Sequence, residues 1–384
     1  MILHTLLDYD VLRVIWWLLL GVLLIGFAVT DGFDLGVGTL LPFVARDDVE
    51  RRIVINTIGP VWEGNQVWLV LGGGAIFAAW PHIYAMSFSG FYLAMFATLF
   101  ALILRPVGFK YRSKHDSAAW RSTWDWALFI GGFVPALIFG VAIGNVLQGV
   151  PFHFTDDMRM VYEGSFFGLL NPFAVLCGLV SVAMLVMHGG AWLALKTDGA
   201  VADRSRRCAT WAGVATIVLY ALAGVLLWTL VSGYQLTSAP VTDGPSNPLV
   251  KTVATGVAGA WFANYQAHPW TLLAPALGFA GAVLALLGLR MRWEGVTVVF
   301  SGLSIAGIIA SVGASMFPFI VPSSTDPRSA LMVWDASSSH LTLFIMLVCA
   351  VIFVPLILAY TAWVYRVMWG KVRPRDITHG DHAY

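Results

Sequence analysis

The sequence predicts an all-α integral membrane protein with nine transmembrane helices. The apolar residue types AVILMFWYC fill 59% of its 384 positions, only 11% are charged, and the mean hydropathy is +0.79. Apolar runs recur that are long enough to cross a bilayer, which takes about 20 residues each. A third observation is that Lys and Arg concentrate in alternate connections. This composition excludes an ordinary soluble domain.

The nine expected spans share high hydropathy and bounding charges or turn-formers. They are Val11 to Ala45, Ile53 to Ala79, Ile83 to Leu104, Trp124 to Leu147, Pro172 to Leu195, Ala209 to Ser232, Trp270 to Leu289, Val296 to Ile320 and His340 to Met368. The first and last exceed the thickness of the bilayer, which tilting would accommodate. Because residues 1–10 carry no basic segment and no cleavage site follows, the first span is expected to be retained.

Charge asymmetry predicts the orientation of the chain. One set of connections and the tail hold 18 of the 22 Lys and Arg residues, and the other set holds Arg13, Arg159, Lys251 and Arg328. The positive-inside rule then places the C-terminus in the cytoplasm and the N-terminus outside. The net charge of +1 indicates no nucleic-acid partner.

The longest connection, residues 233–269, falls on the outer side and contains the turn-forming segment SAPVTDGPSNP. Its length fits either a functional lid or a solvated loop, and we favour the loop. Cys177, Cys208 and Cys349 lie in or beside apolar helices without metal-binding spacing, which indicates reduced thiols.

Acidic residues inside the expected spans are the main candidates for function. Asp31 and Asp34 are three residues apart, which puts both carboxyls on one face of a helix. Glu63 lies in the segment GPVWEGNQVW, as many residues beyond Arg52 as Asp34 lies before Ala45. An antiparallel hairpin would therefore bring the three carboxyls to a similar depth, about 16 Å from the connecting turn. We expect them to form one cluster.

Carboxyls at bilayer depth are costly to bury, so they indicate a functional site. Carboxyls that share a low-dielectric site can take up and release protons, which suits a proton path through Asp31, Asp34 and Glu63, with Asn65 and Gln66 ordering hydrogen bonds beside it. The alternative is structural: glycines on the same face favour close helix packing, and neutral acids would then only join helices.

Arg105 and Asp335 each allow two interpretations. Arg105 ends the third expected span, where Pro106 stops the helix, and its side chain could reach either the aqueous surface or the acids. Trp334 and Asp335 precede the last span, where we favour a helix cap with an interfacial Trp.

The sequence offers no evident haem or metal site. Only His188 lies within a span, with His340 at a helix start, and neither has a paired ligand in the sequence. We interpret His188 as a hydrogen-bonded helix residue.

Several unusual segments together resemble subunit II of the cytochrome bd quinol oxidases. They are VLRVIWWLLLGVLLIGFAVTDGFDLGVG, RRIVINTIGPVWEGNQVWL, FAAWPHIYAMSFSGFY, RPVGFKYRSK, GNVLQGVPF, LLNPF and MFPFIVPSSTDPRSALMVWDASSS. The resemblance extends from the first span through the last.

This resemblance implies a single polytopic domain of two four-helix bundles, over about 11–147 and 172–320, with a peripheral last helix over 340–368. It also implies a partner, subunit I, which holds two haems b and one haem d, while this chain binds no cofactor except a structural ubiquinone. Family members carry Asp or Glu at the position of Glu63. Trp62 and Arg105 would support the quinone or the electrostatics of the acids, and small single-helix accessory subunits remain an open point.

The resemblance thus implies a subunit of an enzyme complex that oxidises quinol and reduces oxygen to water, taking up protons from the cytoplasm. It also implies a place in the bacterial inner membrane, with the N-terminus in the periplasm and the C-terminus in the cytoplasm. Two other classes remain open on the residues alone. Intramembrane acids also suit a proton-coupled secondary transporter, and a purely structural scaffold would keep its acids neutral.

Overall fold

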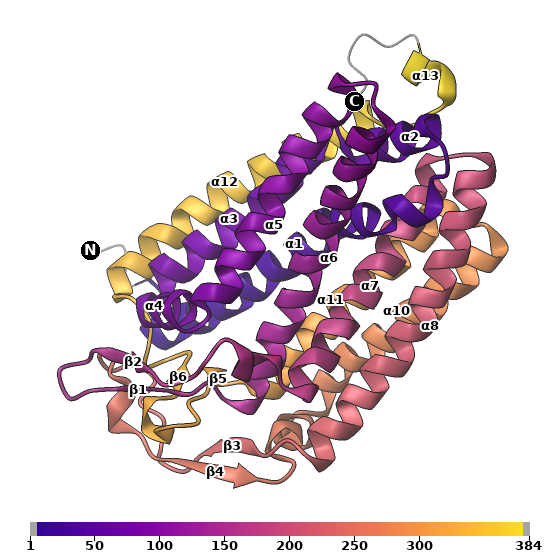
Figure 1. Ribbon diagram of the computed structural model, residues 1–384. Coiled ribbons are helices and arrows are strands. Elements are labelled where there is room, and N and C mark those ends of the chain that lie inside the picture. Colours follow the sequence, from indigo (N-terminus) through magenta and orange to yellow (C-terminus); the bar gives the residue numbers. More distant parts are fainter. Residues whose placement is uncertain (1–5, 379–384) are drawn as a thin grey trace.

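The computed structural model describes residues 6–378, which form long helices joined at one end by short hairpins (Figure 1). The helices are α1 (Tyr9–Val44), α2 (Asp48–Ile58), α3 (Trp62–Ala79), α4 (Pro81–Gly90), α5 (Tyr92–Tyr111), α6 (Ala118–Gln148), α7 (Pro172–Lys196), α8 (Gly199–Thr229), α9 (Ala263–Ala267), α10 (Leu273–Met291), α11 (Glu294–Met316), α12 (His340–Val367) and α13 (Pro374–Thr378). The strands are β1 (Phe152–Phe154), β2 (Met160–Tyr162), β3 (Gly233–Leu236), β4 (Val253–Val257), β5 (Phe319–Val321) and β6 (Leu331–Met332).

Helix α1 is the centre of the packing and contacts α3, α6, α7, α11 and α12. Small residues allow this: a Cβ placed on Gly36 would collide with the backbone of Leu185, and one on Gly189 would lie 2.6 Å from the backbone of Gly36. Helices α1 and α7 therefore approach at backbone distance, as small residues permit in membrane helices.

The remaining long helices pack on either side of this centre. Helices α7, α8, α10 and α11 contact one another in a ring, and α5 packs on α6. Helix α12 lies along the outside beside α3, on the opposite side of the molecule from α8 and α10 (Figure 1). Leu343 is its one buried residue within the described chain, so almost the whole apolar surface of α12 is left uncovered by this chain.

Within residues 6–378, eight helices are long and apolar enough to cross a membrane. Two of the nine expected spans differ from the structure. The span expected over 53–79 is divided into α2 and α3, because Pro60 has no N–H to continue the helix and its ring would collide with the carbonyl four residues earlier. The polar first turn of α3 then lowers that helix's hydropathy.

The span expected over 83–104 is also displaced. Pro81 begins the separate helix α4, and α5 starts only at Tyr92. Our expectation that Pro106 ends the helix is wrong, since α5 continues to Tyr111 with Pro106 inside it. A membrane helix tolerates one such missing N–H when neighbouring helices hold it in place.

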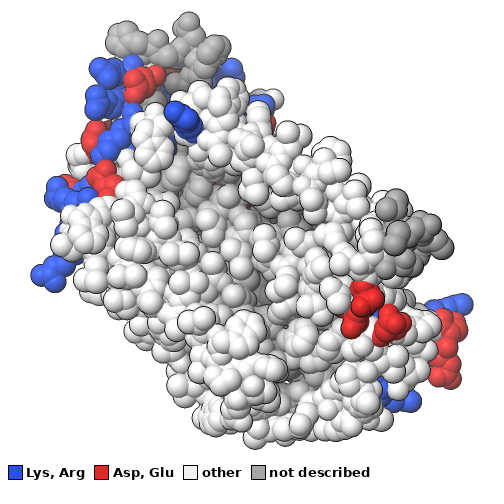
Figure 2. Space-filling view, turned by 180° about the vertical axis from the view of Figure 1, so that it is seen from behind, with Lys and Arg blue, Asp and Glu red and all other residues white. Residues whose placement is uncertain are grey.

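Charged residues mark one end of the helices, which we call the basic end. Ion pairs there join Arg121 to Asp48, Arg204 to Glu50, Arg206 to Glu294 and Lys371 to Glu294. On the face shown in Figure 2, charged side chains gather at one extremity and are separated by a broad uncharged belt from a smaller charged group at the other. An uncharged belt between charged ends is typical of a membrane-spanning protein.

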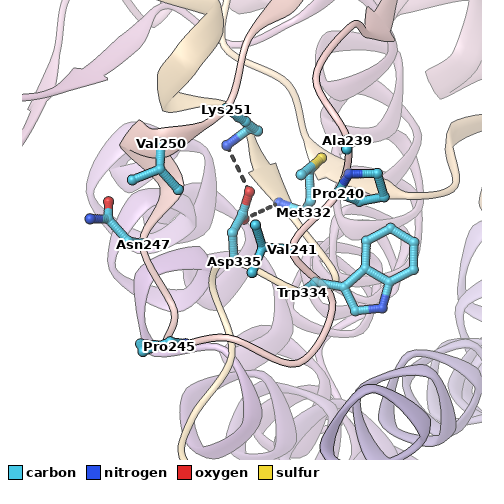
Figure 3. A pocket seen from close by; sticks show the side chains of 10 residues that line it. All are labelled: Ala239, Pro240, Val241, Pro245, Asn247, Val250, Lys251, Met332, Trp334 and Asp335. Carbon is cyan, nitrogen blue, oxygen red and sulfur yellow. Dashed lines mark hydrogen bonds and ion pairs between the residues drawn. The ribbon is translucent and has the colours of Figure 1, made fainter.

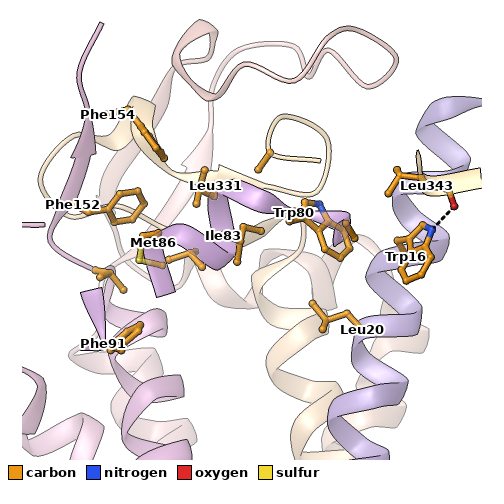
Figure 4. Packing of buried hydrophobic residues seen from close by; sticks show 14 of the residues in the cluster. Trp16, Leu20, Trp80, Ile83, Met86, Phe91, Phe152, Phe154, Leu331 and Leu343 are labelled. Carbon is orange, nitrogen blue, oxygen red and sulfur yellow. Dashed lines mark hydrogen bonds between the residues drawn. The ribbon is translucent and has the colours of Figure 1, made fainter. Parts of the chain in front are cut away.

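The opposite end, which we call the loop end, holds three antiparallel hairpins that pair β1 with β2, β3 with β4 and β5 with β6. A hydrophobic core joins two of them, β1–β2 and β5–β6, to the helices (Figure 4). In it, the indole N–H of Trp16 donates to the carbonyl of Leu343 at 2.9 Å and that of Trp80 donates to the carbonyl of Val333 at 3.2 Å. These contacts tie the start of α1 to the first turn of α12, and the end of α3 to the segment before α12.

Candidate functional site

Asp31 and Asp34 lie on one face of α1, as their spacing predicts, and both are buried. Arg105 of α5 points inward to them rather than to the aqueous surface. Its guanidinium donates two parallel hydrogen bonds to Asp31, from Nη1 to Oδ2 at 3.0 Å and from Nη2 to Oδ1 at 2.7 Å. A bidentate pair of this kind fixes both the charge and the orientation of the carboxylate.

Asp34 is held differently from Asp31. Its Oδ2 accepts a hydrogen bond from Nδ2 of Asn65 at 2.8 Å and lies 3.8 Å from Nη2 of Arg105. Its Oδ1 is buried without a hydrogen-bond partner among the described residues. With both carboxyls ionised, the two acids and one guanidinium carry a net charge of −1, which is expensive to bury. One added proton neutralises the group.

The last long helix supplies a residue that the sequence did not single out. The hydroxyl of Tyr365 in α12 donates to Oδ1 of Asn65 at 2.6 Å. Helix α12 also carries Tyr360, which is exposed, and no sequence signal distinguishes the two tyrosines. We call Asp31, Asp34, Asn65, Arg105 and Tyr365 the carboxyl cluster.

Trp62 covers one side of this cluster. Its side chain is buried, the guanidinium carbon of Arg105 lies 5.9 Å from its ring centroid, and its ring packs on Phe109 at 5.4 Å. The distance suits a cation–π contact. The indole N–H has no hydrogen-bond partner in residues 6–378.

The structure does not bring Glu63 into the cluster, so the expectation of three clustered carboxyls is wrong. Glu63 is exposed and Gln66 is half-buried, and neither side chain makes a hydrogen bond to another side chain of the carboxyl cluster. The reason is geometric: Glu63 and Asn65 are two residues apart on α3, which separates their directions by roughly 200°. Asn65 faces α1, and Glu63 faces outward.

The structure confirms that His188 is a hydrogen-bonded helix residue. Its Nδ1 lies 2.7 Å from the hydroxyl of Ser301 in α11 and its Nε2 lies 2.9 Å from the carbonyl of Val29 in α1. Both ring nitrogens are thereby engaged. No group of three or more His, Cys, Asp and Glu side chains that could hold a metal occurs in the part of the chain that the structure describes.

A second polar group lies at the loop end, in a cavity of about 280 Å³ (Figure 3). There the Nζ of Lys251 lies 2.7 Å from Oδ2 of Asp335, whose Oδ1 accepts from the backbone N–H of Met332 at 2.9 Å. Our interpretation of Asp335 as a helix cap is therefore wrong; Ser339 caps α12 instead. Burial raises the pKa of Asp335 although Lys251 opposes this, and burial lowers the pKa of Lys251.

Arg13 holds the long connection, residues 233–269, in place beside this cavity. It is fully buried, donates to the carbonyls of Thr242 and Gly244 at 2.6 and 2.9 Å, and donates to the hydroxyl of Ser337 at 2.7 Å. Its guanidinium also stacks over Tyr9, with 3.5 Å to the ring centroid. Arg13, a basic residue at the loop end, is thus structural.

The fold and the carboxyl cluster define a class: a multi-pass membrane protein with a buried, hydrogen-bonded group of ionisable side chains at the centre of its packing. Residues 12–368 match the sequence profile of the family "Cytochrome bd terminal oxidase subunit II". The chain belongs to this family.

Relatives support this membership over nearly the whole length. The chain is 52% identical over 376 residues to "Probable cytochrome oxidase subunit 2" of Haemophilus influenzae and 51% identical over 376 residues to "Cytochrome bd-I ubiquinol oxidase subunit 2" of Escherichia coli K12, covering 98% of this chain and 99% of each relative. The "Cytochrome bd ubiquinol oxidase subunit 2" of Bacillus subtilis is 31% identical over 94% of this chain and 97% of its own.

A solved structure shares the fold. The bd oxidase from Geobacillus thermodenitrificans contains a chain that superposes with a TM-score of 0.66 at 16% identity, covering 93% of this chain and 98% of its own. Membership of the family makes this chain a subunit of a quinol-oxidising respiratory complex that contains haem and a subunit I. The apolar helices and the bacterial relatives place it in the inner membrane.

Proposed function

We propose that this chain is the haem-free subunit of its oxidase and that the carboxyl cluster, together with Glu63, conducts protons from the cytoplasm toward the haem-bearing subunit I. The observation that carries the proposal is the unpaired Oδ1 of Asp34, buried beside a fixed Asp31–Arg105 ion pair. A carboxyl with one free oxygen can accept and release a proton without breaking the ion pair. Glu63 and Gln66 on the outward face of α3 continue the path out of this chain.

A quinone can occupy the same region in a supporting role. Trp62 and Arg105 offer a ring face and a cation beside the cluster, and the unpartnered indole N–H of Trp62 fits a carbonyl oxygen of a quinone head group. A ubiquinone bound here would stabilise the packing of α3 against α5.

We further propose nine crossings, with α3 as the ninth, arranged as two four-helix bundles and the peripheral α12. Helix α3 has 18 residues, or roughly 27 Å, close to the thickness of the hydrocarbon core. The start of α1 lies at the loop end, where the hydroxyl of Tyr9 bonds to Ser338, and the tail lies at the basic end, where the N–H of Val372 bonds to Lys196. Ends on opposite sides require an odd number of crossings. By the positive-inside rule, the basic end is cytoplasmic.

The experiment is to purify the oxidase with Asp34→Asn in this chain and to measure its haem spectrum and its quinol-dependent oxygen uptake. We expect intact haem bands and at least tenfold slower turnover, since positioned proton transfer contributes about 10²-fold or more. The matched control is Asp125→Asn, which alters another buried aspartate at the basic end, paired with Arg112. Full turnover by Asp34→Asn would refute the proton path and favour a purely structural role for this subunit.

Two further variants test the other parts. Glu63→Gln should slow turnover without loss of haem, and normal turnover across pH would remove Glu63 from the path. His188→Gln should leave all haem bands in place, because a haem-free chain has no iron for His188 to bind; a lost band would contradict the assignment of the haems to subunit I. Solute transport by the complex in proteoliposomes would favour the transporter.

A further inference from the structure

Tyr365 links the peripheral helix α12 to the carboxyl cluster. Its hydroxyl donates to Oδ1 of Asn65 at 2.6 Å, and Nδ2 of the same amide donates to Oδ2 of Asp34 at 2.8 Å. A carboxamide has one accepting end and one donating end. A tyrosine hydroxyl can donate or accept, but within residues 6–378 the oxygen of the Asn65 amide is the acceptor for the Tyr365 proton, so this donation favours the orientation with Nδ2 toward the carboxyl.

The two orientations of the Asn65 amide have different consequences for Asp34. With Nδ2 toward Asp34, Oδ2 accepts a hydrogen bond and has no need of a proton, so a proton on this carboxyl resides on Oδ1. With the amide reversed, its oxygen would face Oδ2, and two acceptors can meet only if Oδ2 carries the proton. The orientation of the amide thus selects the oxygen that exchanges protons.

The phenol ring of Tyr365 is held in place by aromatic side chains from two other helices. It lies edge-on to Phe33 of α1, with ring centroids 6.4 Å apart, and edge-on to Trp192 of α7 at 6.0 Å. Phe33 and Trp192 stack on each other at 4.1 Å. Phe33 is the residue directly before Asp34, so the aromatic packing and the carboxyl share one turn of α1.

We propose that Tyr365 is a positioning residue: it fixes the amide of Asn65 and so confines the exchangeable proton of Asp34 to Oδ1, the oxygen that has no hydrogen-bond partner within residues 6–378. The inference rests on the proposed proton path and adds to it the residue that determines which oxygen of Asp34 exchanges the proton. It assigns α12 a part in the chemistry although almost all of that helix faces outward. The charged and titratable groups that face Asp34 are Asp31, Arg105 and, through Asn65, Tyr365.

Tyr365→Phe is a clean perturbation, because the ring contacts remain and only the hydroxyl is lost. We expect the oxidase to retain its haem bands and its KM for quinol, while kcat falls about fivefold to tenfold, the effect of one hydrogen bond of about 1–1.4 kcal/mol. The matched control is Tyr360→Phe, which removes an exposed hydroxyl from the same helix and should change neither constant.

Two readouts separate positioning from a structural role. In a double-mutant cycle, Tyr365→Phe should add nothing to Asn65→Ala, since the hydroxyl acts only through the amide. Infrared spectra of the complex in H₂O and D₂O should show the exchangeable carboxyl band of Asp34 shifted or split in Tyr365→Phe and unchanged in Tyr360→Phe. Asn65→Ala leaves α12 intact and serves as the second variant should Tyr365→Phe fail to assemble.

The outcomes distinguish this inference from the proposed function. If Asp34→Asn abolishes turnover while Tyr365→Phe matches Tyr360→Phe in kcat and in the carboxyl band, Tyr365 is not a positioning residue and the path stands. Additive effects of Tyr365→Phe and Asn65→Ala would overturn the inference in the same way. If Asp34→Asn turns over at the full rate, the proton path itself fails.

Discussion

Replacing Arg105 by glutamine should strongly destabilise the fold, whereas the double variant Arg105→Gln with Asp31→Asn should recover much of the loss. The single substitution leaves Asp31 and Asp34 buried on α1 without a counter-charge. The double substitution replaces the ion pair by two neutral amides that can still bond to each other. The comparison therefore separates the effect of charge from that of hydrogen bonding.

The geometry sets the magnitudes. Arg105 donates two hydrogen bonds to Asp31 and its side chain is 3% exposed, and removing one partner of such a buried pair costs about 3–5 kcal/mol. Neutral hydrogen bonds between membrane helices average only about 0.6 kcal/mol. We therefore expect a loss of about 3–5 kcal/mol in Arg105→Gln and less than half of that in the double variant.

The assay is unfolding of the purified complex by SDS in mixed micelles, followed by circular dichroism of the helices. Arg328→Gln is the control, because its ion pair with Asp326 is exposed at the loop end and such pairs contribute about 0–1 kcal/mol. An Arg105→Gln loss no larger than that of Arg328→Gln would refute the reasoning. So would a double variant less stable than Arg105→Gln alone.

Three further substitutions test other parts of the structure. Gly36→Ala should lower the free energy of unfolding by about 1–3 kcal/mol, because the added Cβ forces α1 away from α7. Gly73→Ala, with no atom near the added Cβ, should be neutral or slightly stabilising. Both are measured by the same SDS titration. Burial alone would raise the pKa of Glu50, but hydrogen bonds from Arg204 and the backbone outweigh it and lower that pKa. Glu50→Gln should therefore lower the melting temperature at neutral pH. The variant and the parent should have the same melting temperature once the pH has fallen through the lowered pKa. Lys251→Met removes the cation beside the buried Asp335, whose pKa is already raised by burial. The variant should therefore be least stable at neutral pH and should regain stability as acid protonates Asp335. Melting temperatures measured across pH would show this.

Each of these has an outcome that contradicts it. Equal stability of the Gly36 and Gly73 variants would mean that α1 and α7 have room to separate. A Glu50→Gln deficit that persists unchanged in acid would show that the carboxylate charge is not its origin. A melting temperature of Lys251→Met that is flat across pH would exclude Asp335 as the destabilising group.

The sequence predicts the depth of the cluster residues along their helices better than the helix face on which each side chain lies. Spacing of three residues suffices to put Asp31 and Asp34 on one face of α1, because that relation is internal to a helix. Counting residues from a turn places Asn65 and Glu63 at nearly the same depth, but depth does not say which face of α3 meets α1. The structure settles this rotation: Asn65 bonds to Asp34, and Glu63 faces away.

Partners that are distant in the chain could not be inferred at all. The sequence left two directions open for the side chain of Arg105, and only the packing of α5 on α6 determines the inward one. Tyr365 lies 300 residues from Asn65, and Lys251 meets Asp335 through a connection whose path no local pattern specifies. By contrast, the break at Gly59 and Pro60 carried a local signal, which the continuous apolar run on either side outweighed in our prediction.

The central place of α1 has a consequence for the biogenesis of the protein. This helix is synthesised first, yet its partners are made last: Arg105 follows Asp31 by 74 residues, and Trp16 finds its acceptor only at Leu343. A nascent chain therefore holds its two central acids without their cation until α5 has entered the bilayer. The loop end of α1 likewise lacks the acceptor of Trp16 until translation reaches α12. A chain cut short before α12 lacks the partners that this helix gives to Asn65 and Trp16.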